Sequence, residues 1–211
     1  MLTPVEVDRS DSAFIKPTKF VGLGYDTRQA ADKAMKRESW DGYEYYPQTE
    51  KWRRLVASPA PIKIESLKAI ETLYNTGNFL LVCGIGGGVP YSIKKDKTIR
   101  REAAVIDKDL ETAVIAVHLG IEEFFISTAI DYLKLDFKKP TEKNVISLSK
   151  KDLDKFLEED KKRKDNEKQF ALGAMEPKLR AIKYFLDHSK VKDAKAYIVS
   201  VENIKDAIIH T

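Results

Sequence analysis

Four of the five residues from Gly84 to Gly88 are glycine, and they directly follow the apolar stretch of residues 78–83, "NFLLVC". Because glycine has no side chain, the backbone N–H groups of such a loop can approach an anion such as a phosphate closely. The spacing matches neither the loop that ends in Gly-Lys-Ser/Thr nor the dinucleotide-binding glycine pattern. Two interpretations stay open: an anion-binding loop, or a tight turn in which the backbone packs closely against a neighbour.

A lysine between two aspartates, Asp107–Lys108–Asp109, begins a second segment that could do chemistry. Apolar residues at helical spacing follow and predict a helix over 107–120 with a buried stripe of Leu110, Ala113, Val114 and Val117. Lysine is unfavourable at a helix N-terminus without an anionic partner, because the helix dipole is positive there. Phosphoryl transfer requires such a cation near the moving group. The alternative is a cluster of surface salt bridges, with Asp107 as an ordinary N-cap.

Alternating strands and helices are expected to position both segments. Between residues 60 and 211, short apolar runs typical of buried strands occur at 78–83, 123–128 and 195–200. Amphipathic stretches typical of helices separate them, at 65–76, 107–120, after Ser149, at 176–188 and after Ser200. This alternation predicts an α/β layered domain with a mainly parallel sheet. Residues 1–58 differ, with two expected strands and a polar helix at 26–38, and we interpret them as a separate small lobe.

Composition excludes several classes of protein. The 37 basic and 33 acidic residues give a net charge of +4 without a basic tail, so no nucleic-acid partner is expected. The single cysteine, Cys83, allows no internal disulfide, is expected in the apolar core, and suits a reducing cytoplasm. No secretory signal or membrane-spanning run is predicted. The histidines lack partners at metal-ligand spacing, so no protein-held metal is expected.

Five stretches in register resemble one known family. "RRLVASPAPIKI", "VCGIGGGVPY", "EAAVIDKDLETAV", "TAIDYLKLDFKKPTEK" and "LGAMEPKLRAIKYF" occur in this order and resemble the carbamate kinase branch of the amino acid kinase family. The resemblance implies a three-layer α/β fold and a reversible phosphate transfer between ATP/ADP and carbamate or carbamoyl phosphate, with Mg²⁺. It also implies a cytoplasmic homodimer that forms ATP during arginine breakdown.

The resemblance also implies roles for particular residues. Lys108 would neutralise the transferred phosphoryl group, Asp109 would hold Lys108, and Lys178 would be a second phosphate-side lysine. Lys19 would reach in from the lobe, within a Pro-Thr-Lys element. The segment "LKLDFKKP" would lie near the adenine and ribose. The cofactor-binding residues implied in this way are Gly86, Gly87, Gly88, Thr128, Asp131 and Met175.

The resembling family opens with a strand and a first glycine loop of the Gly-Gly-Asn type, and no Gly-Gly-Asn occurs in this sequence. We therefore expect an amino acid kinase fold truncated at its N-terminus, with a protruding lobe at 1–58 and a nucleotide-binding portion at 59–211. We expect the activity of this chain alone to be impaired. The alternatives are a non-catalytic remnant, or one chain of a split kinase that binds a complementing N-terminal chain.

Overall fold

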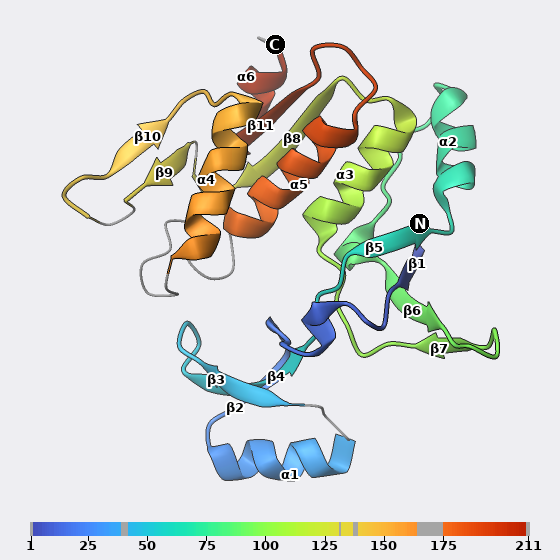
Figure 1. The fold of residues 1–211 in the computed structure, drawn as a ribbon, viewed down its shortest axis with the longest axis vertical. Coiled ribbons are helices and arrows are strands. Elements are labelled where there is room, and N and C mark those ends of the chain that lie inside the picture. Colours follow the sequence, from blue (N-terminus) through green and yellow to red (C-terminus); the bar gives the residue numbers. More distant parts are fainter. Residues whose placement is uncertain (1, 39–41, 131, 137–138, 164–174, 210–211) are drawn as a thin grey trace. The chain divides into compact units, whose positions relative to one another are not determined.

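The computed structural model describes residues 2–38, 42–130, 132–136, 139–163 and 175–209 (Figure 1). The chain divides into two compact units, Met1–Lys108 and Asp109–Thr211. The boundary falls at the first turn of helix α3 (Lys108–Leu119). The expected division into a lobe at 1–58 and a nucleotide-binding portion at 59–211 stays a prediction.

A four-stranded sheet of order β5-β1-β6-β7 forms the centre of the first unit. Its strands are β1 (Pro4–Val7), β5 (Pro61–Ile64), β6 (Val89–Ile93) and β7 (Ile99–Arg101). β1 is antiparallel to β5 and parallel to β6. Its alternate residues Val5 and Val7 are buried, as expected when one face of a strand meets the core. Helix α2 (Leu67–Asn75) follows β5 and buries Ile70.

A second, antiparallel sheet of order β2-β4-β3 lies in the same unit. Its strands are β2 (Lys19–Tyr25), β3 (Tyr43–Tyr46) and β4 (Lys51–Val56). Helix α1 (Arg28–Glu38) lies between β2 and β3 in the chain. Ala31 and Ala34 form the buried side of α1. The sequence predicted β1, β4 and α1 but not β2 or β3. Two glycines interrupt β2 and tyrosines dominate β3, so neither has the apolar run of a buried strand.

The second unit places helices against a two-stranded parallel sheet (Figure 1). β8 (Glu123–Thr128) and β11 (Lys195–Ser200) pair in register along their whole length, both as predicted. The core joins Phe124 and Ile126 of β8 to residues of α3, α4 (Lys150–Lys162) and α5 (Met175–His188), with Phe185 fully buried. A hairpin of β9 (Leu133–Leu135) and β10 (Lys143–Val145) and a short helix α6 (Ile204–Ile209) complete the unit.

Parallel pairing is less extensive than the sequence predicted. In the described parts of the chain, only β1–β6 and β8–β11 are parallel, and the other strand pairs are antiparallel. The class is α/β as expected, but the sheets are mixed. The buried stripe of α3 also differs, since Ala113, Ile115 and Ala116 are buried while Val114 is only half-buried. Leu110, Ala113 and Val117 of the predicted stripe do pack in or against the core, so the prediction was wrong for Val114 and missed Ile115 and Ala116.

The apolar stretch of residues 78–83 is not a strand, contrary to the prediction. No described residue pairs with it in a sheet. Three of its apolar side chains face solvent, with Leu80 95% exposed, Val82 63% and Phe79 60%, while Leu81 is half-buried. Cys83, expected in the core, is half-buried. Hydrophobicity correctly marked a segment suited to burial, but a strand also requires a neighbouring edge to supply its hydrogen bonds.

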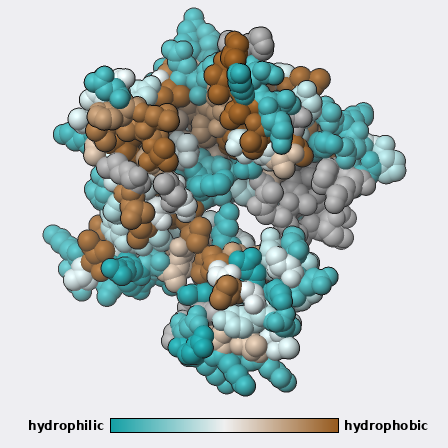
Figure 2. Space-filling model, turned by 180° about the vertical axis from the view of Figure 1, so that it is seen from behind, coloured by the Kyte–Doolittle hydropathy of each residue, from teal (hydrophilic) through white to brown (hydrophobic). Residues whose placement is uncertain are grey.

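Other hydrophobic side chains are also exposed, and Figure 2 shows them gathered in patches on the surface. In the part of the chain that the structure describes, no helix combines the length and the apolar character needed to cross a membrane.

Candidate functional site

The glycine loop adopts a backbone that other residues rarely adopt. Gly84, Gly86, Gly87 and Gly88 all have positive φ, between 66° and 87°. A Cβ atom on Gly87 would overlap the carbonyl oxygen of Ile106, and one on Gly88 would lie 2.5 Å from the carbonyl oxygen of Thr3. By contrast, a Cβ on Gly86 would meet nothing within 4 Å. Close backbone packing therefore explains Gly87 and Gly88, whereas Gly86 borders open space that an anion could enter.

Lys19 in the first unit makes an ion pair that the sequence did not predict. Its Nζ donates a hydrogen bond to the Asp107 carboxylate at 3.0 Å. Lys19 lies on β2, and Asp107 immediately precedes α3. Asp107 was expected only as a helix cap. The one sequence signal for a role of Asp107 at the candidate site was its position next to Lys108, which was itself a predicted site residue.

Lys178 and Asp109 form a lysine–aspartate ion pair in the second unit. Lys178 Nζ donates to Asp109 Oδ2 at 2.8 Å, and the two side chains are only 12% and 14% exposed. Asp109 lies in the first turn of α3 and Lys178 in the first turn of α5. A largely buried, hydrogen-bonded pair holds a lysine in one position more firmly than a surface pair does. The expected contact of Asp109 with Lys108 stays a prediction.

Glu176 also lies in the first turn of α5, two residues before Lys178. Its carboxylate accepts two hydrogen bonds from the Arg180 guanidinium, at 3.0 and 2.7 Å. Glu176 and Arg180 are four residues apart, so they lie on the same side of the helix. Residue 178 lies between them in sequence and points in a different direction. Arg180 therefore neutralises the negative charge nearest to Lys178 in sequence.

The remaining predicted residues lie at the ends of elements in the second unit. Thr128 is the last residue of β8 and pairs with Ser200 at the end of β11. Ligands of parallel sheets bind at such carboxyl ends. Met175 is the first residue of α5, and its side chain packs against the core. Asp131 lies outside the described residues.

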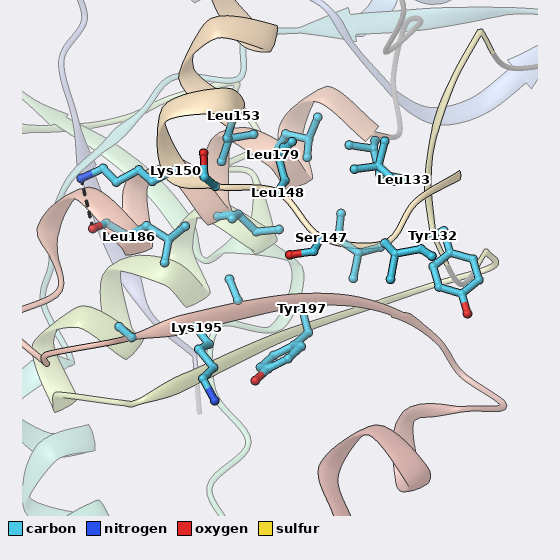
Figure 3. A pocket seen from close by; sticks show the side chains of 17 residues that line it. Tyr132, Leu133, Ser147, Leu148, Lys150, Leu153, Leu179, Leu186, Lys195 and Tyr197 are labelled. Atoms are coloured by element: carbon cyan, nitrogen blue, oxygen red, sulfur yellow. Dashed lines mark hydrogen bonds between the residues drawn. The ribbon is translucent and has the colours of Figure 1, made fainter. Parts of the chain in front are cut away.

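A cavity of about 470 Å³ opens in the second unit (Figure 3). Apolar side chains from the β9–β10 hairpin, the following loop, α4, α5 and β11 line it, among them Leu133, Leu148, Leu153, Leu179, Ile182 and Ile198. Tyr132, Tyr197, Lys150 and Lys195 supply its polar groups. Leu133 belongs to the segment expected near the nucleotide, and Leu179 directly follows Lys178. The sequence did not predict the rest of the lining, because these residues are far apart along the chain.

Acidic and histidine side chains do not gather into a metal centre within the described ranges. No three His, Cys, Asp or Glu residues there are placed to hold an ion together.

Comparison with known proteins identifies relatives of the whole chain. No family model matches it. "Carbamate kinase 3" of Staphylococcus aureus (strain USA300) is 35% identical over 209 residues, which are 99% of this chain and 62% of that protein. The "Carbamate kinase" of Clostridium perfringens is 35% identical over 213 residues, 98% of this chain and 61% of that protein.

The same relationship is found among solved structures. Carbamate kinase from Giardia lamblia bound to AMP-PNP matches with a TM-score of 0.77 at 32% identity, over 99% of this chain and 61% of that chain. The chain thus spans about three fifths of the length of the proteins it matches. Nearly all of this chain is homologous to the carbamate kinases, and it has their α/β fold over the region that it shares with them.

Proposed function

We propose that this chain is a carbamate kinase-like phosphotransferase that exchanges a phosphoryl group between ATP and carbamate, forming ADP and carbamoyl phosphate reversibly. The observation that carries the proposal is Lys178, held by Asp109 at 2.8 Å next to a residue that lines an apolar cavity. A fixed cation and an apolar pocket within one unit suit a nucleotide, whose base is apolar and whose phosphates are anionic. The homologous carbamate kinases support the same reaction class.

Phosphoryl transfer requires the protein to position groups and to neutralise charge. In this proposal Lys178 contacts the phosphates and Asp109 fixes its position. Lys108 supplies a second cation from the first turn of α3, where the helix dipole also favours an anion. Lys19 and Gly86 belong to the first unit, and their expected roles toward the phosphates stay predictions. Asp107 holds Lys19 in place.

We propose that the cavity takes the nucleotide base. Its volume of about 470 Å³ lies within the range of small-molecule sites. Tyr132 and Tyr197 offer aromatic faces, and the neighbouring aliphatic side chains exclude water from a bound ring. The AMP-PNP bound to the homologous Giardia enzyme supports a nucleotide as the ligand.

Mg²⁺ is part of the reaction that the resemblance implies. The described residues offer no preformed cluster of carboxylates for it. Kinases commonly hold Mg²⁺ through substrate phosphates with one or two protein carboxylates. We therefore propose that Mg²⁺ enters with the nucleotide, and we assign it no ligand from the described residues.

The alternative candidate is a protein that binds nucleotide without catalysis, or one chain of a split enzyme. The assays below separate it from the leading proposal. The leading proposal extends to a cytoplasmic, homodimeric enzyme that forms ATP in arginine breakdown.

Two assays on the same preparations test the proposal. Calorimetry with MgADP measures binding, and a coupled assay measures ATP formed from ADP and carbamoyl phosphate. Lys178→Ala should weaken binding by about 10- to 100-fold, because one charge-assisted hydrogen bond is lost. Lys155→Ala, at a lysine on α4 whose side chain is 69% exposed and does not line the cavity, is the matched control and should bind as the wild type does.

The outcomes separate the candidates. ATP formation that Lys178→Ala abolishes and Lys155→Ala retains supports the kinase. Binding without turnover supports the non-catalytic or split protein. Absence of binding at millimolar MgADP contradicts both.

A further inference from the structure

We propose that the cavity of the second unit accepts purine nucleotides without distinguishing adenine from hypoxanthine or guanine, and that the Ser147 hydroxyl is the side-chain group that hydrogen-bonds the base. The inference rests on the proposed nucleotide site and deepens it, because it names the class of nucleotide and a specificity-determining residue. The chemistry of the side chains that line the cavity carries it.

Most of the lining side chains cannot form hydrogen bonds. Eleven of the seventeen lining residues are alanine, valine, leucine or isoleucine. An apolar surface recognises the size and shape of a ring, but it discriminates poorly between rings of the same shape that differ in one polar substituent. Adenine, hypoxanthine and guanine share one ring system. Polar groups in the cavity must therefore supply any discrimination among them.

Two of the polar lining residues are already bound to partners in the protein. Ser149 caps α4, since its hydroxyl accepts a hydrogen bond from the Asp152 backbone N–H at 3.1 Å and donates one to the Asp152 carboxylate at 2.5 Å. The Lys150 ammonium lies 2.6 Å from the Asp187 carboxylate and donates to the carbonyl oxygen of Leu186 at 3.4 Å. These contacts hold both side chains in structural roles.

The polar ends of three further lining residues lie at the edge of the cavity. The Tyr197 hydroxyl donates a hydrogen bond to Glu123 at 3.1 Å. Figure 3 shows this hydroxyl and the Lys195 ammonium directed away from the lining leucines, as the alternation of side chains along β11 requires. Tyr132 is 43% exposed. None of the three therefore places its polar end among the apolar side chains.

Ser147 differs from these residues. It lies in the loop between β10 and α4. Figure 3 shows its hydroxyl directed into the space between this loop and β11. Among the residues that the structure describes, this hydroxyl forms no hydrogen bond with the protein. It is therefore the side-chain group best placed to bond a base that enters the cavity.

A serine hydroxyl both donates and accepts hydrogen bonds, and it rotates to suit its partner. Adenine presents an amino donor at position 6, whereas guanine and hypoxanthine present a carbonyl acceptor there. One rotatable hydroxyl can bond any of the three. A pyrimidine is smaller, so it buries less apolar surface in the same cavity and binds more weakly.

Calorimetry with four nucleotides tests the proposal on the full 211-residue chain. The ligands are the magnesium salts of ADP, IDP, GDP and CDP. We expect the Kd values of the three purine nucleotides to agree within about tenfold, because the apolar lining does not separate them. CDP should bind more than about tenfold more weakly than ADP, because of its smaller buried surface.

Three variants test the role of Ser147. Ser147→Ala should weaken the binding of ADP, IDP and GDP alike, by about 3- to 10-fold, because one neutral hydrogen bond is lost. Ser147→Thr keeps the hydroxyl and should restore binding. Ser127→Ala makes the same change at an exposed serine of β8 that does not line the cavity, and it should bind as the wild type does.

The outcomes distinguish this inference from the proposed function. Absence of binding by all four nucleotides would overturn both. ADP that binds while IDP and GDP are more than about tenfold weaker would overturn the inference alone, since a fixed group must then read the amino group of adenine. CDP that binds as tightly as ADP would overturn the preference for purines. Equal effects of Ser147→Ala and Ser127→Ala would overturn the role of Ser147.

Discussion

Single residues decide how the cations of the candidate site are held. Lys178 and Asp109 are largely buried, whereas Lys19 and Asp107 are 30% and 17% exposed. Asp109→Asn should therefore lower the free energy of unfolding by about 1–3 kcal/mol, because Lys178 keeps its charge without a counter-ion. Asp107→Asn should lower the free energy of unfolding by only about 0–1 kcal/mol. Urea unfolding measures both, and equal effects would contradict the difference in burial.

The glycine loop offers a second comparison between neighbouring residues. Gly87→Ala should lower the free energy of unfolding by more than about 3 kcal/mol, because its Cβ meets the carbonyl oxygen of Ile106 in a left-handed backbone. Gly86→Ala has the same backbone strain but open space, and should cost about 1–2 kcal/mol. Denaturant unfolding of both variants measures the difference between their free energies of unfolding. A larger loss for Gly86→Ala would show that the loop packs differently.

Residue types could be predicted from the sequence, but their partners could not. The residue pattern singled out Lys108 and Asp109, and the family resemblance added Lys19 and Lys178. The pairs Lys19–Asp107 and Lys178–Asp109 join residues 88 and 69 positions apart. Which carboxylate meets which lysine depends on how α3 lies against its neighbours, and local patterns contain no such information.

At the scale of elements, local signals predicted helices and isolated strands well. Ser149 caps α4 as expected, since its hydroxyl accepts a hydrogen bond from the backbone N–H of Asp152. β8 and β11 have their predicted bounds. The failure at residues 78–83 has a different origin, because strand formation depends on a partner edge that the described residues do not provide. The cavity was missed for a similar reason, since five separate segments line it.

The charged contact between α4 and α5 yields a prediction about acid stability. Lys150 first, and then Lys183, hold the pKa of Asp187 below its usual range through hydrogen bonds. A lowered folded-state pKa means that Asp187 stabilises the protein above its unfolded pKa. This contribution is lost as the pH falls through the folded-state pKa.

The Asp187→Asn variant should therefore be less stable than the wild type near neutral pH, and the difference should shrink as the pH falls through and below the ordinary range of an aspartate pKa. Lys150→Met should show the same convergence, because it removes the first partner of Asp187. Thermal melts across this pH range measure both variants. A difference that stays constant down to the lowest pH would contradict the role of Asp187.

At the scale of the whole molecule, the chain combines two compact units with only part of its relatives' length. Lys178, Asp109 and the cavity all belong to the second unit, Asp109–Thr211. If the proposed site is correct, nucleotide binding through these groups should not require the glycine loop of the first unit. We therefore expect binding and turnover to be separable in this chain.

We expect MgADP to stabilise the whole chain by mass action, because the folded second unit binds it and the unfolded chain does not. At a free concentration about tenfold above Kd, the stabilisation is about 1.4 kcal/mol. For a chain of this size, this raises Tm by about 3–5 °C. Hydrogen exchange should slow mainly around β9, β10 and the first turn of α5, where the cavity and Lys178 lie. Magnesium chloride alone is the control for the salt effect. An unchanged Tm at millimolar MgADP, or protection confined to the first unit, would contradict a nucleotide site built on Lys178 and the cavity.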